Sequence, residues 1–435
     1  MLNLRLMLLP ILAMWIIPAV AAPIPAWVQM APGGGSVVRA LVKADSCPVV
    51  HSSDHIVPMT DRVGPATLPL RANKAGQATP AAFPTRVCEA HLPRSAHHAS
   101  LDGQRLPLPR AQINRIVLIG DTGCRLKASE AAWQNCNDPA QWPFAAIAAR
   151  AAALHPDLVL HVGDYHYREN SCPPDQSQCA DTPAGYGEAG WRADFFDPAA
   201  PLLAAAPWVM VRGNHEECAR AGQGWWRLLD PHPLRAGSDC VDPANDATSN
   251  HTDPYAVRLG GNAQLVVADL MELASGKPGD SAATAAFARD MAAIDALARR
   301  SKTSFFTAHF PFNPVLWDKY GPGAIAVGGK PLDAFNPPPL HHIRAMLAGH
   351  IHLFQVARFS DRPTQVITGF SGTLEDVPLG PASLAEAAGT PGAPTLTALT
   401  TIPDRFGYAL MERRAHGWRL TAYGVDGKAM AQFPL

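Results

Sequence analysis

Residues 157–167 read DLVLHVGDYHY and carry the pattern on which the interpretation of the fold rests. The largely apolar run ends at Val162, and Gly163 and Asp164 follow at once. A continuous apolar run of this length is typical of a strand that is buried on both faces of a sheet. The sequence therefore predicts a buried strand whose end carries a carboxylate and, three residues later, the phenol of Tyr167.

Four further segments repeat this arrangement of an apolar run and a polar end. They read RIVLIGDTG (residues 115–123), PWVMVRGNHE (207–216), TSFFTAH (303–309) and IRAMLAGHIH (343–352). Open α/β sheets alternate such strands with helices and bind ligands beyond the strand ends. We therefore expect all five polar ends to meet on one rim of an α/β fold.

The rest of the chain supplies candidates for helices and further strands. Residues 142–154 and 281–300 are rich in alanine and have apolar spacing near the helical period, and Asp280 or Ser281 would cap the second helix. We expect the candidate strands 365–368, 406–411 and 418–423 to complete a second sheet. Residues 382–401 have the composition of a loop.

Length and composition limit the possible classes of protein. A chain of 435 residues exceeds one ordinary hydrophobic core, and 47% hydrophobic against 17% charged residues exclude a disordered chain. The 36 basic residues nearly balance the 37 acidic ones, so a formal charge of -1 gives no basis for stable nucleic-acid or membrane binding. We therefore expect function to depend on a local site.

The N-terminus has the pattern of an export signal. It reads MLNLRLMLLPILAMWIIPAVAA, in which Arg5 precedes a short apolar run that ends in the small-residue pattern AVA. Residues 1–21 are therefore expected to be a signal peptide, and the protein to be secreted or periplasmic, with no membrane association after cleavage. An uncleaved anchor is the alternative, but the run is short and prolines interrupt it.

Residues 22–109 differ in character from the rest of the chain. Short β-prone runs such as residues 36–42 alternate there with glycine and proline clusters. We expect a small β-rich N-terminal domain over this range, followed by a catalytic domain over residues 110–435. The proline-rich segment 106–109 would link them.

Eight cysteines lie in the first 240 residues. An even count in an exported chain favours disulfides. Pairing of sequence neighbours is the prediction, joining Cys47 to Cys88, Cys124 to Cys136, Cys172 to Cys179 and Cys218 to Cys240. A cysteine-ligated zinc site is the alternative, and the lack of any C-x-x-C pair argues against it.

The polar side chains at the five strand ends form a donor set for metal ions. They are Asp121, Asp164, Tyr167, Asn214, His215, His309, His350 and His352. Two cations about 3.5–4 Å apart need a bridging carboxylate with several flanking oxygens and imidazoles. The set supplies that number and kind of donor.

The same segments resemble the five signature blocks of calcineurin-like metallophosphoesterases, and they occur in the family's order. The matching residues are Gly120-Asp121-Thr122-Gly123, Gly163-Asp164-Tyr165-His166-Tyr167, Gly213-Asn214-His215-Glu216, Thr307-Ala308-His309 and Gly349-His350-Ile351-His352. Among the subtypes, the chain resembles the purple acid phosphatases most, because Tyr167 stands three residues after Asp164. The resemblance implies a two-sheet α/β sandwich of metallophosphoesterase type, in addition to the small N-terminal β domain.

The resemblance also implies a binuclear centre. Asp121, Asp164, Tyr167 and His352 would bind one metal, Asp164, Asn214, His309 and His350 the other, and Asp164 would bridge them. Fe(III) is expected at the site with the Tyr167 phenolate, because a hard, highly charged ion suits that ligand. Zn(II), Fe(II) or Mn(II) would suit the second site.

The activity that the resemblance implies is hydrolysis of phosphoric esters by an enzyme like the acid phosphatases. A metal-bound hydroxide would attack phosphorus in line, and a small phosphate monoester is the favoured substrate. His215 would donate a proton to the leaving group or stabilise the transition state. Orienting Asn214 or Asp121 is its alternative role.

One departure from the family pattern keeps other functions open. The family commonly supplies further substrate-binding histidines from the segment after the fourth block, but residues 310–340 contain none. A phosphodiesterase or a nucleotide pyrophosphatase is therefore an alternative, as is a non-catalytic metal-binding scaffold. His166, His341 and His342 could compensate, although surface or core positions are expected for them.

Two other features of the motif region are interpreted as structural. Glu216 is expected to support the fold, and Trp225 and Trp226 are expected to pack in the interior and not to line a pocket.

Overall fold

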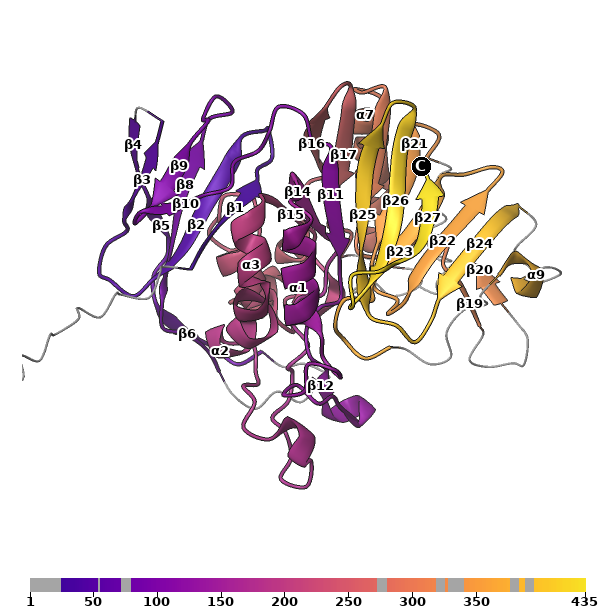
Figure 1. The fold of residues 1–435 in the computed structure, drawn as a ribbon. Helices are drawn as coiled ribbons and strands as arrows, with labels where there is room; N and C mark the ends of the chain where they lie inside the picture. Colours follow the sequence, from indigo (N-terminus) through magenta and orange to yellow (C-terminus); the bar gives the residue numbers. More distant parts are fainter. Residues whose placement is uncertain are drawn as a thin grey trace, which may run out of the picture.

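The computed structural model describes residues 25–53, 55–71, 80–271, 280–317, 325–327, 340–375, 383–387 and 395–435 (Figure 1). The expected signal peptide lies outside the described residues. Among the described helices, none has the length and apolar character needed to cross a bilayer.

Two large sheets form the body of the protein. The first follows the order β27-β26-β25-β11-β14-β15-β1-β2-β8-β5 and the second the order β16-β17-β18-β21-β23-β22-β24. The first sheet contains β1 (Ala26–Met30), β2 (Ser36–Val42), β5 (Thr60–Val63), β8 (Arg86–Leu92), β11 (Arg115–Ile119), β14 (Leu158–His161), β15 (Trp208–Met210), β25 (Gly407–Arg414), β26 (Gly417–Gly424) and β27 (Ala429–Pro434). The second contains β16 (Tyr255–Gly260), β17 (Ala263–Val267), β18 (Thr303–Thr307), β21 (Ile343–Ala348), β22 (Phe354–Phe359), β23 (Thr364–Thr368) and β24 (Leu396–Ile402).

Shorter elements surround these sheets. Small sheets are made by β3 (Val49–Ser52), β4 (His55–Pro58), β9 (Ala99–Leu101) and β10 (Gln104–Arg105), by β6 (Ala66–Leu68) and β7 (Ala81–Phe83), by β12 (Leu126–Lys127) and β13 (Ala132–Trp133), and by β19 (Val315–Trp317) and β20 (Ile325–Val327). The α-helices are α1 (Phe144–Ala153), α2 (Glu188–Trp191), α3 (Asp197–Ala205), α4 (Gly222–Leu228), α5 (Asp246–Ser249), α7 (Ser281–Ala298) and α9 (Leu384–Ala387).

The two sheets pack face to face and helices cover their outer faces (Figure 1). Leu118 and Leu160 of the first sheet share one core with Phe305 and Leu347 of the second. The opposite face of the first sheet packs against α1 and α3, and that of the second against α7. The predicted α/β sandwich is therefore confirmed.

This arrangement explains the continuous apolar runs of the motif strands. In β11, Ile116 and Leu118 face the core between the sheets, whereas Val117 and Ile119 pack under the helices. Since both faces are buried, every position of the strand after Arg115 is apolar. All five predicted motif strands are present, and so are the two predicted helices, with Asp280 as the N-cap of α7.

Two expectations about the C-terminal third were wrong. Of the three candidate strands, only residues 365–368 join the second sheet. β25 pairs antiparallel with β11 in the first sheet, and β26 pairs antiparallel with β25. Residues 382–401, expected to be a loop, contain α9 and most of β24, which pairs with β22. β24 is the last strand of its sheet and is exposed at several positions, so its residues carry little of the apolar signal of a buried strand.

The N-terminal region is rich in strands, as predicted, and continues the first sheet. β1 pairs in parallel with β15, and β2, β8 and β5 follow in the same sheet (Figure 1). A separate domain ending at residue 109 stays a prediction.

Buried arginines join this N-terminal region to residues 226–232, which follow the third motif strand in the sequence. Arg39 is fully buried and donates to the carbonyls of Leu228 and Asp230 over 2.8 and 2.6 Å. Arg62 donates to the carbonyls of Trp226 and His232. Glu89 accepts from both guanidinium groups and balances their charge.

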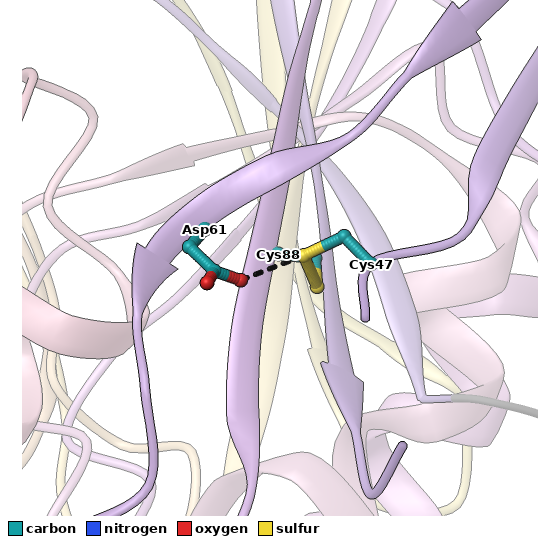
Figure 2. A group of neighbouring side chains, drawn as sticks. All are labelled: Cys47, Asp61 and Cys88. Carbon is teal, nitrogen blue, oxygen red and sulfur yellow. Dashed lines mark hydrogen bonds between the residues drawn. A yellow bond between two sulfur atoms is a disulfide. The ribbon is translucent and has the colours of Figure 1, made fainter. Parts of the chain in front are cut away.

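All four predicted disulfides are present, joining Cys47 to Cys88, Cys124 to Cys136, Cys172 to Cys179 and Cys218 to Cys240. Figure 2 shows the carboxylate of Asp61 beside the first bridge, with Oδ1 3.0 Å from Cys47 Sγ. Because both sulfurs belong to a disulfide, neither is a thiolate that could bind a cation. This cluster is therefore not a metal site.

Replacing Arg39 tests how much its buried contacts with Glu89 and with the carbonyls of Leu228 and Asp230 stabilise the fold. We expect Arg39→Ala to lower the free energy of unfolding by about 3 kcal/mol, since it leaves buried carbonyls and Glu89 with fewer donors. Urea unfolding measures the change. The control is Arg299→Ala, which removes a largely exposed pair with Asp295 and should shift stability by less than about 0.5 kcal/mol. Equal effects of the two substitutions would contradict this account.

Candidate metal centre

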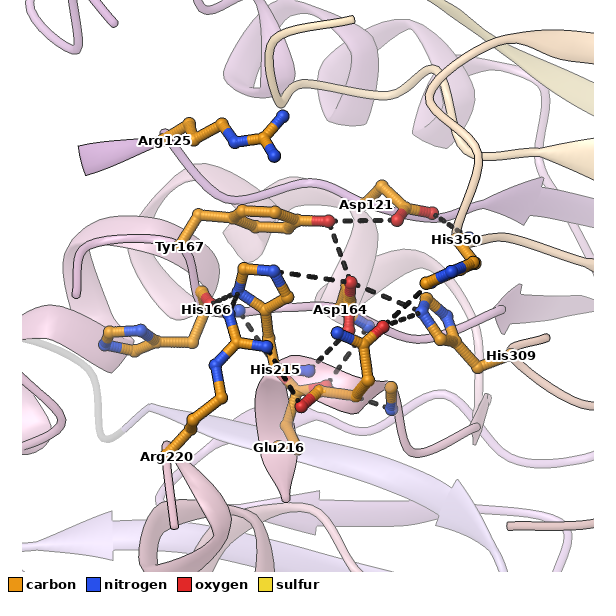
Figure 3. Close-up of polar contacts among 12 residues, drawn as sticks. Asp121, Arg125, Asp164, His166, Tyr167, His215, Glu216, Arg220, His309 and His350 are labelled. Atoms are coloured by element: carbon orange, nitrogen blue, oxygen red, sulfur yellow. Dashed lines mark hydrogen bonds and ion pairs between the residues drawn. The ribbon is translucent and has the colours of Figure 1, made fainter. Parts of the chain in front are cut away.

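The five motif strands deliver their polar ends to one place (Figure 3). Asp121 follows β11, Asp164 follows β14 and Asn214 follows β15, all from the first sheet. His309 follows β18, and His350 and His352 follow β21, from the second sheet. The site therefore lies where the ends of the two packed sheets meet, which agrees with the expected common rim.

Sharp turns at the strand ends aim these side chains. Asp121, Asp164 and His350 have left-handed backbones, with φ of 54°, 57° and 71°. Non-glycine residues adopt this region rarely and at a cost, and such residues concentrate at functional sites. Gly213 allows the close approach, since a Cβ there would lie 2.1 Å from the backbone nitrogen of Asp164.

The first cluster consists of Asp121, Asp164 and His352, whose donor atoms lie within 4.8 Å of one another. The hydroxyl of Tyr167 lies at its centre, 3.0 Å from Asp121 Oδ1, 2.8 Å from Asp164 Oδ2 and 2.9 Å from His352 Nε2. Burial and the two carboxylates raise the pKa of Tyr167 well above its usual value. Without a cation the phenol therefore keeps its proton and donates it to the carboxylates.

The second cluster consists of Asp164, His309 and His350. The side-chain oxygen of Asn214 lies 2.9 Å from His309 Nε2 and 2.9 Å from His350 Nδ1. His309 Nε2 is also 3.3 Å from Asp164 Oδ2. Asp164 therefore belongs to both clusters, as predicted for a bridging ligand.

The orientation of the imidazoles fits bound cations. His309 Nδ1 faces the carbonyl of Val162 at 2.9 Å, and His352 Nδ1 faces that of Leu374 at 2.7 Å. Such carbonyls fix the proton on the far nitrogen of a ligating histidine and leave the near nitrogen to face the metal.

The charges of the buried carboxylates and of His309 also fit bound cations. Burial alone would lower the pKa of His309, but Asp164 and Asp121 raise it to about 9. A proton thus compensates the carboxylates in the absence of a cation, and a cation would replace it. The donor set and its electrostatics fit two metal ions.

Comparisons with known proteins agree with this geometry. A sequence profile of calcineurin-like phosphoesterases matches residues 114–354, more than half of the chain. The chain belongs to this family. Its members typically bind two metal ions, in keeping with the two clusters of this phosphoesterase.

Solved structures with the same fold include phosphatases. The purple acid phosphatase PPD1 from yellow lupin (Lupinus luteus) superposes with a TM-score of 0.54 and 14% identity, over 95% of this chain and 74% of that chain. A structure described as PhoD gives 0.52 and 12%, over 96% and 90%. At these identities the likeness establishes the fold alone. No curated protein sequence matches the chain significantly.

Glu216 holds the turns of this phosphoesterase together, which confirms the structural role expected for it. Its fully buried carboxylate accepts from the backbone nitrogens of Asp164, Tyr165, His166 and Gly213, over 2.9–3.1 Å. Burial and the charge of Asp164 raise the pKa of Glu216 to about 8. One side chain thus joins the turn after β14 to the turn after β15.

His215 lies beside the clusters, as predicted, but makes contacts that the sequence did not indicate. Its backbone nitrogen donates to Asp164 Oδ1 over 2.9 Å, and its ring packs on the ring of Tyr167 with centroids 3.8 Å apart. Glu169 and Arg220 contact its Nδ1. Both residues lie within a few positions of a signature block, and that proximity is the only sequence signal that could have identified them.

The remaining sequence candidates lie away from the clusters. His166 is buried with its Nε2 3.0 Å from the carbonyl of Gly185, and His341 and His342 are exposed. Trp225 and Trp226 are buried in the core, which confirms the packing interpretation. The structure therefore places no compensating histidine from this group at the centre.

Replacing Glu216 tests how far this carboxylate organises the centre. Glu216→Gln exchanges an acceptor for a donor, so we expect a loss of about 1–3 kcal/mol of stability and a metal content well below that of wild type. Unfolding curves and elemental analysis measure the two effects. Unchanged metal content would show that the turns after β14 and β15 hold their geometry without this carboxylate.

Proposed function

We propose that the protein is a binuclear-metal phosphomonoesterase of the purple acid phosphatase type. The observation that supports this most directly is the sharing of Asp164 between two clusters of metal-binding side chains. The contact of Tyr167 with both carboxylates and His352 supports the subtype. The same set could also serve a scaffold that binds metal without catalysis, and activity measurements distinguish the two.

Two ions at these sites would supply an acidified water as nucleophile and positive charge for the phosphoryl oxygens. Asp121, Asp164, Tyr167 and His352 would hold one ion, for which the phenolate favours Fe(III). Asp164, Asn214, His309 and His350 would hold the other, with Zn(II), Fe(II) or Mn(II) as candidates.

The residues of the chain contribute orientation and proton handling. Asp164 is held by the backbone nitrogen of His215 and lies in reach of both clusters. His215 Nε2 lies 3.8 Å from Asp164 Oδ2. We propose that this nitrogen assists the departure of the leaving group.

The alternative within the same fold is a phosphodiesterase or a nucleotide pyrophosphatase. The absence of histidine from residues 310–340 supports keeping it. Turnover of p-nitrophenyl phosphate against bis(p-nitrophenyl) phosphate decides between them, and faster hydrolysis of the diester at equal concentration would favour the alternative.

The four disulfides support a site of action outside the reducing cytosol, in the periplasm or the medium. A small phosphate ester is the proposed partner, and the balanced net charge supports the absence of stable nucleic-acid binding.

The bridging carboxylate gives the decisive test. We expect Asp164→Asn to lower kcat for p-nitrophenyl phosphate by at least about 100-fold, since it weakens both metal sites at once. Circular dichroism should show an intact fold. Wild-type protein that carries two metals and hydrolyses neither ester would overturn the proposal in favour of a scaffold.

The identity of the first metal has its own test. Purified without added metal, the protein is expected to contain iron and to show a visible absorption band that arises from the phenolate of Tyr167. The variant Tyr167→Phe should lose this band. Iron-loaded wild type without the band would exclude Tyr167 as a ligand.

A further inference from the structure

A buried ion pair lies beside His215 and has no part in the steps above. Glu169 is fully buried, and Arg220 follows the turn that carries Asn214 and His215. The guanidinium of Arg220 pairs with Glu169 Oε1 and donates from Nη1 to the carbonyl of Asn214 over 3.2 Å. Tyr186 donates its hydroxyl proton to Glu169 Oε2 over 3.0 Å. Both carboxylate oxygens therefore have fixed partners.

The ring of His215 is held between this pair and the carboxylate of Asp164. Figure 3 shows the ring between Arg220 and Asp164. Its Nδ1 faces two acceptors, Glu169 Oε1 at 3.0 Å and the carbonyl of His166 at 3.0 Å. Arg220 Nη2 lies 2.6 Å from the same nitrogen and shares Glu169 Oε1 with it. Arg220 Nη2 can only donate, and Glu169 Oε1 accepts from it. Two acceptors, one of them charged, then remain for a proton on Nδ1, so we assign the ring proton to Nδ1, with Nε2 on the side of Asp164.

The charges of the pair stabilise each other. Burial alone would raise the pKa of Glu169, but Arg220 and His215 lower it far below its usual range. Burial alone would lower the pKa of Arg220, and Glu169 raises it above its usual value. A buried pair held by several hydrogen bonds is a rigid support, because any displacement exposes an uncompensated charge to the interior.

We propose that Glu169 and Arg220 are positioning residues that fix the ring of His215 with one proton on Nδ1, so that Nε2 can take a second proton from water and pass it to the leaving oxygen. The inference rests on the proposed function for its chemical consequence, although the placement of the ring is independent of it. It also explains how one histidine could serve a centre that lacks further histidines in residues 310–340. The competing view is that the pair only braces the fold.

The sharpest test compares two esters whose leaving groups differ in their need for a proton. Glu169→Gln keeps the shape of the side chain and removes its charge. We expect its kcat to fall about tenfold more for phenyl phosphate than for p-nitrophenyl phosphate, because phenolate leaves less readily without assistance, with KM changed by less than about twofold. A variant that only loosens the fold lowers both rates alike.

A double-mutant cycle assigns the effect to His215. In the His215→Ala background, Glu169→Gln should change kcat by less than about twofold, since the ring through which Glu169 acts is gone. The matched control is Glu188→Gln, because Glu188 is also buried but binds Thr85 and lies outside the centre. This control should leave the ratio of the two rates at its wild-type value.

A readout without turnover completes the experiment. Ring-nitrogen NMR of histidine-labelled, metal-free wild type should show a single His215 tautomer with its proton on Nδ1, and Glu169→Gln should show a mixture. If Glu169→Gln fails to fold, Arg220→Lys takes its place, since it keeps the charge and loses the planar contact. The same directions are expected for it.

The outcomes separate the two proposals. Three results would make the pair a structural brace and overturn the inference. They are equal losses of kcat on both esters, an undiminished effect of Glu169→Gln on kcat in the His215→Ala background, and an unchanged single tautomer of His215 in the variants. Metal-loaded wild type that hydrolyses neither ester would defeat the proposed function, and the tautomer measurement would still decide the role of Glu169 and Arg220.

Discussion

The carboxylate of Asp164 is the constraint on which the structure depends. It must lie between groups from two different sheets, so the end of β14 cannot continue as a strand and turns at once into the left-handed region. That backbone is held by hydrogen bonds to Glu216, and the side chain by the nitrogen of His215. The strain at one residue is thus maintained by a neighbouring turn that itself carries an expected ligand.

The two-sheet architecture serves this purpose directly. Three strands of the first sheet end in expected ligands, and two strands of the second sheet end in the three histidines. Close packing of the two sheets therefore brings the expected ligands together. The shared core, with Leu118 and Leu160 against Phe305 and Leu347, sets that distance. Interiors of this density deform little, which gives the centre a fixed geometry before any ion binds.

The sequence was most informative where burial and chemistry coincide. The motif strands are buried on both faces, so their apolar runs, the expected ligands after them and the neighbouring cysteine pairs could be predicted. The strand β24 could not be predicted, and neither could the sheet that β25 and β26 join. Their pairing partners lie far away in the chain, and such pairing leaves no local pattern in the sequence. Glu169 and Arg220 could not be predicted either, since a buried ion pair is recognised only when both partners are seen together.

The strand order of the first sheet has a consequence for how the protein is made. The central strands β11, β14 and β15 are flanked by β25 on one side and β1 on the other, so both ends of the chain close the sheet around its middle. Contacts of such long sequence separation form late and slowly. Every side chain of the two clusters precedes β25 in the sequence, and until β25 has paired, β11 keeps one open edge. The strand that delivers Asp121 therefore gains its second partner only through a contact of long sequence separation.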